Sequence, residues 1–392
     1  MKAIINTKLL LEDSIIFDGA ITFEHGRIIR LGKQSEGFIP EDAEIIDAHG
    51  LYTAPGLIDI HTHGSSSQYA YLDPIGCAKT FVRHGVTTYL PTFYCNLTLE
   101  QMLEGLVRVK AAQKDAVGKT VAGIYMEGPY MGGFGSNQKF IRWAGDIERE
   151  EYAELLEQMA DTVKIWAIDP ARDGIDRFLR DAKAVNSAAV FALGHSHATS
   201  EQCRRVENFG LKLQTHHGDS GTIPGKAQGT IGAGCDEYTL YHPDMYAELI
   251  CDENGIHVVP DRLKFALRTK GIEKIILITD CMPVTGDYKN NEADGIAWGP
   301  DLNYDYEGHL AGSHLTMENA CRNLMSHTGC GICQAVRMAS LNPAKLLGME
   351  NEIGSLAAGK KANLILIDDT VRVKHVYLEG EEVYESAAGA SV

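Results

Sequence analysis

The middle of the chain alternates between short apolar runs and longer amphipathic segments. The short runs are rich in β-branched residues, which is typical of buried strands, and segments such as 151–159 and 201–208 have the pattern of amphipathic helices. Alternation of this kind predicts parallel strands connected by helical crossovers. Eight candidate strands are present, at residues 56–61, 85–93, 120–127, 163–168, 190–195, 211–216, 247–254 and 274–280.

Eight strand–helix repeats predict a TIM (β/α)8 barrel, an α/β fold that carries its active site at the carboxyl ends of its strands. An open, doubly wound sheet is the alternative. That fold would need a glycine-rich phosphate loop after an early strand, and the sequence has none. We therefore expect a barrel over residues 54–355.

Both ends of the chain have a different, strand-only pattern. Near the start, β-type runs at 3–10, 14–23 and 26–31 are separated by the turn signals Asp18-Gly19 and His25-Gly26. Near the end, further runs lie at 363–367, 372–378 and 382–384. Neither piece has enough apolar surface to fold alone. We therefore expect one small, discontinuous β-sandwich domain, formed by residues 1–53 and 356–392.

Composition places the chain among soluble globular proteins. Of its 392 residues, 44% are hydrophobic and 23% are charged, and the formal net charge is −17. A nucleic-acid partner is disfavoured because phosphate backbones require a positively charged surface. An anionic small substrate is still possible, since it needs only one or two local cations. The sequence shows no signal peptide and no membrane span, so we expect no membrane partner.

The cysteines indicate a reducing compartment. Nine cysteines in a chain of this length, without a secretory signal, are typical of free thiols in a cytoplasmic protein. Cys330-Gly-Ile-Cys333 has the spacing of a redox or metal motif, but it opens a helical pattern and has no second pair. A structural or incidental role is the better interpretation of that motif.

Candidate chemistry lies at the ends of the predicted strands. His61 and His63 are two residues apart in a strand, so both imidazoles can point toward one position. Other predicted strands also end in histidine or a carboxylate, the residue types that bind transition metals or carry protons. Five of the eight strands share this feature, which is too many for simple polar caps. The sequence therefore predicts a metal site at one rim of the barrel, with candidate residues His61, His63, Glu127, His195, His216 and Asp280.

Longer motifs surround these residues and point to a known family. On these motifs the chain resembles the amidohydrolase superfamily and, within it, the N-acetylglucosamine-6-phosphate deacetylases. The similarity covers essentially the whole chain, including the split β-domain. The motifs are Pro55-Gly-Leu-Ile-Asp-Ile-His-Thr-His-Gly64, Glu127-Gly-Pro129, Gly194-His-Ser196, Thr215-His216, Gly255-Ile-His257, Ile278-Thr-Asp280 and Ala311-Gly-Ser-His-Leu-Thr-Met317.

The resemblance implies a role for each of the strand-end residues. Glu127, His195 and His216 match the metal ligands that the deacetylases share, and His61 and His63 match the first-strand pair of the superfamily. Some deacetylases have lost that pair and keep one metal ion. We therefore expect one or two divalent ions per subunit, and hypothesise two, bridged by Glu127; zinc and iron are the leading candidates. Asp280 matches the catalytic carboxylate.

The resemblance is weaker at the substrate-binding positions. His257 matches a substrate-binding histidine. Lys226 stands where the family has a phosphate-binding arginine that reaches in from a neighbouring subunit, which implies a homodimer or a higher homo-oligomer. Asp219 stands where an asparagine meets the phosphate, and a carboxylate there repels an anion. The remaining candidate substrate contacts are Ser136, Asn137, Ser220 and Gly312.

Together these features predict metal-dependent hydrolysis of the acetamide of an N-acetyl amino sugar. N-acetylglucosamine 6-phosphate is the leading substrate. The same chemistry on N-acetylgalactosamine 6-phosphate, on an unphosphorylated N-acetylhexosamine or on another N-acyl compound is the alternative. A non-catalytic metal-binding relative is an alternative of another class, although such relatives typically lose metal ligands or the final aspartate.

Overall fold

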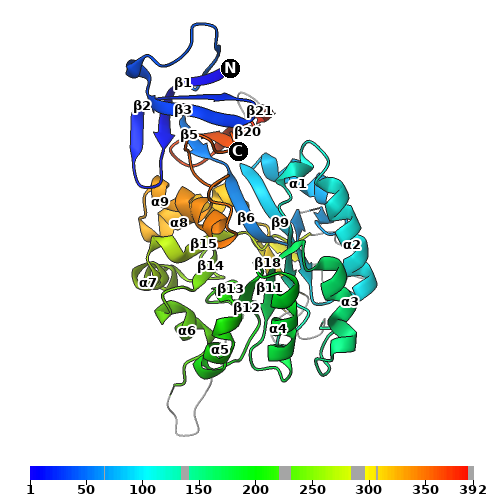
Figure 1. The fold of residues 1–392 in the computed structure, drawn as a ribbon. Helices are drawn as coiled ribbons and strands as arrows, with labels where there is room; N and C mark the ends of the chain where they lie inside the picture. The colour runs from blue at the N-terminus through cyan, green and yellow to red at the C-terminus, as the bar shows by residue number, and fades with distance from the viewer. Residues whose placement is uncertain (66, 134–140, 220–230, 284–295, 306–307, 387–392) are drawn as a thin grey trace.

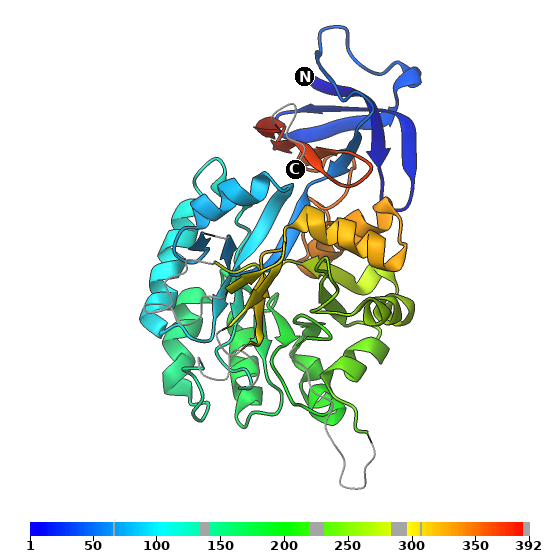
Figure 2. The same cartoon turned by 180° about the vertical axis from the view of Figure 1, so that it is seen from behind.

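A computed structural model describes residues 1–65, 67–133, 141–219, 231–283, 296–305 and 308–386. Eight parallel strands form a nearly closed barrel with helices around it, and a second sheet made from the two ends of the chain lies at one end of the barrel (Figures 1 and 2). The predicted TIM barrel with a separate β-domain is therefore confirmed. The domain limits at residues 53 and 355 stay predictions.

The barrel strands follow one another around the sheet in the order of the sequence. Each corresponds to one of the eight predicted runs, and an open doubly wound sheet, in which the strand order reverses, is excluded. The strands are β6 (Leu57–Thr62), β9 (Val86–Tyr94), β10 (Ile124–Glu127), β11 (Val163–Ile168), β12 (Val190–Leu193), β13 (Leu211–Gln214), β14 (Tyr246–Ile250) and β15 (Ile275–Ile278).

The helices pack their apolar faces against the outside of the barrel. Two of them begin with a capping box, in which Thr98 pairs with Gln101 and Thr199 pairs with Gln202. The helices are α1 (Pro74–Val82), α2 (Leu99–Ala112), α3 (Arg149–Met159), α4 (Ile175–Val185), α5 (Ser200–Val206), α6 (Cys235–Tyr241), α7 (Pro260–Lys270), α8 (Met317–Thr328), α9 (Ile332–Met338) and α10 (Leu341–Leu346), with short 3-10 turns at Gln34–Glu36, Gly118–Thr120, Glu207–Phe209 and Ile272–Lys274. Among the described residues, no helix is long and apolar enough to cross a membrane.

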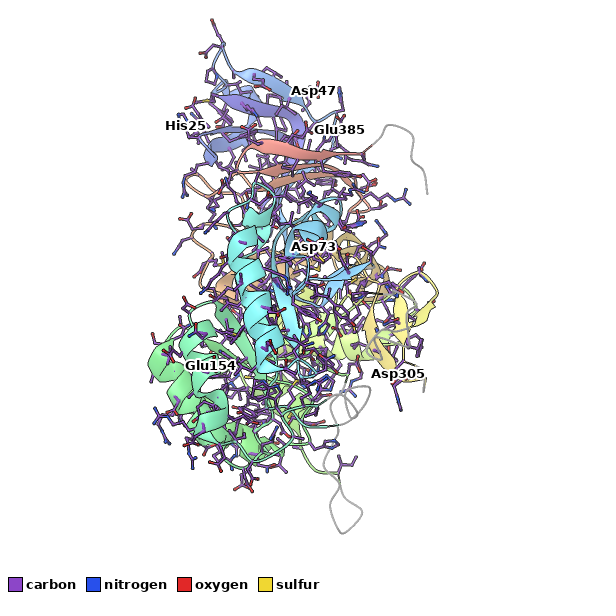
Figure 3. The ribbon with its side chains drawn as sticks, turned by 90° about the vertical axis from the view of Figure 1, so that its right-hand side faces the viewer. His25, Asp47, Asp73, Glu154, Asp305 and Glu385 are labelled. Atoms are coloured by element: carbon purple, nitrogen blue, oxygen red, sulfur yellow. The ribbon has the colours of Figure 1, made fainter. Side chains whose placement is uncertain are left out.

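The terminal sheet joins the two ends of the chain through the antiparallel pair β5 and β19. Its apolar side chains, among them Ile4, Phe23 and Leu364, form a small core of their own. In Figure 3, His25 and Asp47 from the first part of the chain and Glu385 from the last part lie in this same layer. The strands are β1 (Lys2–Leu10), β2 (Ile15–Glu24), β3 (Arg27–Lys33), β4 (Glu44–Asp47), β5 (Tyr52–Pro55), β19 (Leu364–Ile367), β20 (Val373–Leu378) and β21 (Glu381–Glu385).

Two smaller sheets lie at the carboxyl ends of the barrel strands. A tight hairpin joins β7 (Gly64–Ser65) to β8 (Gln68–Tyr69), directly after the first barrel strand. A three-stranded sheet is formed by β16 (Ile296–Trp298), β17 (Leu302–Tyr304) and β18 (Leu310–Ser313). It projects to one side of the barrel near the labelled Asp305 in Figure 3. Its last strand is linked to the segment just after β15 by a bridge between Cys281 and Ser313.

The seam between the first and last barrel strands is closed by buried polar contacts. The backbone N–H of Asp280 donates to the carbonyl oxygen of His61 at 2.9 Å. The hydroxyl of Thr279 donates to Asp59 at 2.6 Å, and the same carboxyl accepts the backbone N–H of His61 at 3.3 Å. Burial raises the pKa of Asp59 to about 7, although the hydrogen bonds from Thr279 and His61 act in the opposite direction. This one buried side chain therefore ties β6 to the end of β15.

Replacing Asp59 by alanine is expected to destabilise the barrel by about 3 kcal/mol, because the Thr279 hydroxyl and nearby backbone N–H groups would remain buried without an acceptor. The measurement is the urea midpoint of unfolding at a fixed metal concentration, with the slope unchanged. Asp59→Asn keeps an acceptor oxygen, and its free energy of unfolding is expected to fall by less than half as much. Equal midpoints for Asp59→Ala and the wild type would contradict this role for the seam.

Candidate metal centre

The predicted strand ends converge at the carboxyl end of the barrel. Glu127 is the last residue of β10, whereas His195, His216 and Asp280 lie just beyond β12, β13 and β15. Four predicted strands were therefore too long. Three of them ended in these residues, and the fourth ran to residue 254, whereas β14 ends at Ile250. For the first three the reason is the backbone, because His195, His216 and Asp280 have φ angles of 42°, 28° and 50°. A positive φ ends a strand and is strained for a non-glycine residue, so it marks a site whose surroundings enforce it.

A β-bulge directs the first-strand histidines. Asp59 pairs with Tyr89 of β9 and Thr62 pairs with Pro91, so β6 contains one more residue than β9 over this stretch. A bulge of this kind changes the face to which the following side chains point. His61 and His63 reach the inside of the barrel, where both are buried.

Glu127 lies between two pairs of imidazoles. Its Oε2 atom is 3.1 Å from Nε2 of His63 and 3.6 Å from Nε2 of His61. Its Oε1 atom is 3.2 Å from Nε2 of His195 and 3.2 Å from Nε2 of His216. Two groups of possible metal ligands therefore share this carboxylate. Ligand atoms bound to one tetrahedral zinc ion at ~2.0–2.1 Å lie about 3.3 Å apart, which matches these separations.

The buried polar atoms of the cluster fit a divalent metal ion. Nε2 of His61, Oε2 of Glu127 and Oδ1 of Asp280 are buried without a hydrogen-bond partner. Buried charged groups that are not compensated are costly, and a cation at this position would compensate them. Imidazole nitrogens together with carboxylate oxygens are a donor set that suits zinc or iron. The residues present therefore fit a metal centre in which each half has its own imidazole pair.

The protonation states of the cluster link metal binding to the release of protons. Burial opposes ionisation of Glu127, but the charge of His61 and hydrogen bonds from His195 and His216 hold its pKa well below the usual range. Burial also lowers the pKa of His216, yet contact with Glu127 raises it to about 9. Protons and a metal ion therefore compete for the same imidazole nitrogens, so metal binding is expected to release protons.

Asp280 joins the half of the cluster that contains the first-strand pair. Its Oδ1 atom is 3.2 Å from Nε2 of His63 and 3.5 Å from Nε2 of His61. Burial raises the pKa of Asp280, but the nearby charges of His61 and His63 lower it by more, so the net shift is downward. Gly312 packs against this residue with a φ of 64°, and a Cβ atom there would lie 2.7 Å from the Asp280 carbonyl oxygen. The structure thus places Gly312 against the backbone of the site.

His257, which is buried, and Asp219, which is partly exposed, form a second pair. Nδ1 of His257 lies 2.7 Å from Oδ2 of Asp219. Burial raises the pKa of Asp219, but the hydrogen bond and charge of His257 bring it down to about 2, so this carboxylate is ionised. Burial lowers the pKa of His257 and Asp219 raises it more, with a net upward shift. Nε2 of His257 is buried without a hydrogen-bond partner and is available to a ligand.

Two buried carboxylates support the site and were not predicted. Oε2 of Glu248 lies 3.0 Å from Nδ1 of His61 and accepts the backbone N–H of His216 at 3.1 Å. Asp252 accepts the backbone N–H groups of Ile256 and His257 and so holds the loop that carries the latter. Glu248 lies within β14, and Asp252 lies just after it. A carboxylate within or directly after an apolar run was the signal in the sequence that could have found them.

Four predicted substrate contacts lie outside the described residues. They are Ser136, Asn137, Ser220 and Lys226. His197 and His217 are not part of the two ligand groups: His197 is exposed, and Nδ1 of His217 lies 2.7 Å from Oε1 of Gln214.

Comparisons with known proteins agree along the whole chain. A sequence profile of the amidohydrolase family matches residues 52–383. N-acetylgalactosamine-6-phosphate deacetylase from Escherichia coli O157:H7 is 28% identical over 386 residues, which cover 95% of this chain and 97% of that protein. N-acetylglucosamine-6-phosphate deacetylase from Vibrio furnissii is 27% identical over 388 residues, with 94% and 92% covered.

Solved structures show the same architecture. The crystal structure of N-acetylglucosamine-6-phosphate deacetylase from Pasteurella multocida has a TM-score of 0.84 at 22% identity and covers 97% of this chain and 99% of that chain. A mutant of the Mycobacterium smegmatis deacetylase in complex with N-acetyl-D-glucosamine-6-phosphate has a TM-score of 0.82 at 25% identity, with 97% and 99% covered.

Removing Glu248 is expected to weaken metal binding. The carboxylate accepts the Nδ1 proton of His61 and so leaves Nε2 free to bind a metal ion, and losing such a partner typically costs about 10–100-fold in metal affinity. We expect two ions per wild-type chain and close to one in Glu248→Ala after dialysis, measured by elemental analysis and titration calorimetry. Glu248→Gln keeps an acceptor oxygen and should retain more metal.

Glu253, which is exposed and lies five residues further along the chain, provides the matched control. Glu253→Ala should bind metal like the wild type. Unchanged stoichiometry and affinity in Glu248→Ala would show that this carboxylate does not support the metal centre.

Proposed function

The chain belongs to the amidohydrolase family, and we propose that it removes the acetyl group from an N-acetylated amino sugar, with N-acetylglucosamine 6-phosphate as the leading substrate. It is a hydrolytic enzyme. Similarity to deacetylases over more than nine-tenths of the chain supports this reaction. A non-catalytic relative would be expected to have lost part of the site, whereas every residue matched to a ligand or to the catalytic carboxylate is present.

The observation that carries the proposal is the position of Asp280 beside a shared carboxylate. Glu127 faces an imidazole pair with each of its oxygens, and Asp280 approaches one of those pairs at 3.2 Å. A carboxylate at that position can exchange protons with a water molecule held at the centre. This arrangement supports hydrolysis, because a candidate base and the residues that would hold a metal ion lie together in one buried site.

The reaction consumes one water for each amide cleaved. When bound, a divalent metal ion acidifies a water molecule and polarises the acyl oxygen. Asp280 takes one proton from the attacking water as the new C–O bond forms at the acyl carbon. It then returns that proton to the amine nitrogen as the C–N bond breaks, leaving acetate and the free amino sugar. His257, whose pKa is raised by Asp219 against the effect of burial, donates a hydrogen bond from Nε2 to the substrate.

We further propose two divalent ions per subunit, zinc or iron, with Glu127 as the bridging ligand. The two imidazole pairs support this number, since each faces a different oxygen of the carboxylate. A homodimer, in which Lys226 of the partner subunit reaches the phosphate, is proposed from the resemblance to deacetylases. A cytoplasmic location is supported by nine free cysteines.

The galactosamine isomer is the second candidate substrate. The E. coli relative at 28% identity is an N-acetylgalactosamine-6-phosphate deacetylase, so whole-chain similarity does not separate the two epimers. Asp219 does not separate the epimers either, because this ionised carboxylate opposes the phosphate that both of them carry. The phosphate of either substrate would therefore need a cation to offset Asp219.

Asp280→Asn is expected to keep its metal and to lose at least about a thousandfold in kcat, because an amide cannot carry the proton from water to the amine. Acetate release and elemental analysis of the same sample test this. Retained turnover in a fully metallated variant would remove Asp280 from the mechanism.

Acetate release measured side by side should identify the substrate. We expect kcat/KM to be highest for N-acetylglucosamine 6-phosphate, lower for its galactosamine epimer, and lowest for the unphosphorylated sugars, because phosphate binding adds affinity that free sugars lack. A higher value for free N-acetylhexosamines would refute the phosphorylated substrate and would be the result that Asp219 favours. No acetate release from any of the four sugars would refute the proposed function.

A further inference from the structure

The loop between β14 and α7, which carries His257, is held at its start by a buried carboxylate that the proposed mechanism does not use. This residue is Asp301, which is 2% exposed and lies directly before β17. Its Oδ2 atom accepts the backbone N–H of Glu253 at 2.7 Å. Glu253 lies four residues before His257, so this bond fixes the backbone from which the rest of the loop extends.

Helix α8 supports the same stretch of backbone. Nδ2 of Asn323 donates to the carbonyl oxygen of Cys251 at 2.9 Å and lies 3.4 Å from Oδ2 of Asp301. One turn further along the helix, Nε2 of His327 lies 2.9 Å from the carbonyl oxygen of Asp252. Three successive residues at the start of the loop are therefore tied either to α8 or to Asp301.

Asp301 is also joined to the segment that carries Asp280. The backbone N–H of His314 donates to the carbonyl oxygen of Asp301 at 2.9 Å. Ser313, the residue before His314, donates its own backbone N–H to the carbonyl oxygen of Asp280 at 2.8 Å. A short path through β17 and β18 therefore connects the loop of His257 with the backbone of Asp280.

The position of Asp301 is costly for the stability of the fold. Its Oδ1 atom is buried and has no hydrogen-bond partner among the described residues. Burial, together with the charges of Asp252 and Glu253, raises the pKa of the carboxyl, and the hydrogen bond from the Glu253 N–H offsets this only in part. An apolar residue would avoid this penalty, so a carboxyl group here indicates that its geometry is needed.

We propose that Asp301 is a positioning residue, which holds His257 at a fixed distance from Asp280 so that both reach one bound substrate. The inference rests on the proposed function, in which Asp280 moves the proton and His257 donates a hydrogen bond from Nε2. A misplacement of ~1 Å in a group of this kind can cost about 100-fold in rate. The small sheet contacts the His257 loop through Asp301 and the Asp280 segment through Ser313, so it sets the spacing that a substrate must fit.

Asp301→Ala is expected to lower kcat/KM by about 10–100-fold on the amino sugar that the wild type hydrolyses fastest, with unchanged metal content. The loss should come mainly from a higher KM, because His257 contacts the bound substrate as well as the transition state. In a His257→Ala background the same change should cost less than about twofold, since the group that Asp301 positions is already absent.

Asp301→Asn keeps an acceptor oxygen for the Glu253 N–H and should retain most of the activity. Asn323→Ala is a second variant in case Asp301→Ala folds poorly, and it should raise KM by a smaller factor. Asp368→Ala is the matched control, because Oδ1 of Asp368 accepts the backbone N–H groups of Thr370 and Arg372 at 2.9 Å in the terminal domain. This control should leave KM unchanged.

Hydrogen exchange separates this inference from the proposed function. In Asp301→Ala, the backbone N–H groups of residues 253–257 should exchange at least about tenfold faster, whereas Asp368→Ala should leave them unchanged. Unchanged exchange in Asp301→Ala, or a loss of activity that simply multiplies that of His257→Ala, would refute the positioning role. If the wild type releases no acetate from any of the sugars, the proposed function fails, and the exchange measurement still decides whether Asp301 holds the loop.

Discussion

The contact on which the site depends is that of Glu127 with four buried imidazoles. The carboxylate is 1% exposed, and its two oxygens face histidines from three other strands of the barrel. A charge in such a position is tolerated only when it is compensated, so the whole rim must keep its geometry for the centre to exist. The strained backbone at His195, His216 and Asp280 follows from this constraint, because each residue turns its side chain inward where a regular strand would have continued.

The barrel and the metal centre are therefore parts of one arrangement. Asp59 ties the first strand to Thr279 at the start of the loop that carries Asp280, and the bulge that follows Asp59 turns His61 and His63 into the barrel. Glu248 in turn contacts the side chain of His61 and the backbone of His216, which belong to different halves of the site. Asp59 and Glu248 each contact residues from other strands, so we expect a change at one ligand to affect another.

Much of this organisation could be predicted from sequence, and the features that could not be predicted have identifiable physical reasons. Eight apolar runs gave the barrel strands, because burial on both faces of a parallel strand leaves a continuous apolar pattern. Polar residues that end such runs predicted the histidines and carboxylates that the structure brings together, and their role as a metal site stays a prediction. The predicted strands that ended at His195 and His216 extended too far along the chain, because nothing about a histidine in a sequence indicates a positive φ. Glu248 was missed, since a glutamate inside an apolar strand does not reveal which side chain it will meet after folding.

The electrostatic balance of the site bears directly on the substrate. Glu127, Asp280 and Asp219 all have lowered pKa values despite burial, and each owes this to imidazoles. If a divalent cation binds, the histidines that coordinate it would lose their protons and no longer offset these carboxylates, and the charge of the cation would offset them instead. Asp219 is distinct because its partner His257 lies outside both ligand groups; burial lowers the pKa of His257, and contact with Asp219 raises it by more. A protonated His257 offsets part of the charge of Asp219 and can present the N–H at its Nε2 atom to a substrate. A phosphate group gains little from such a pair, whereas a neutral acyl oxygen or hydroxyl gains a hydrogen bond. The proposed recognition of the acetamide would therefore use described residues, whereas recognition of a phosphate would need a cation elsewhere.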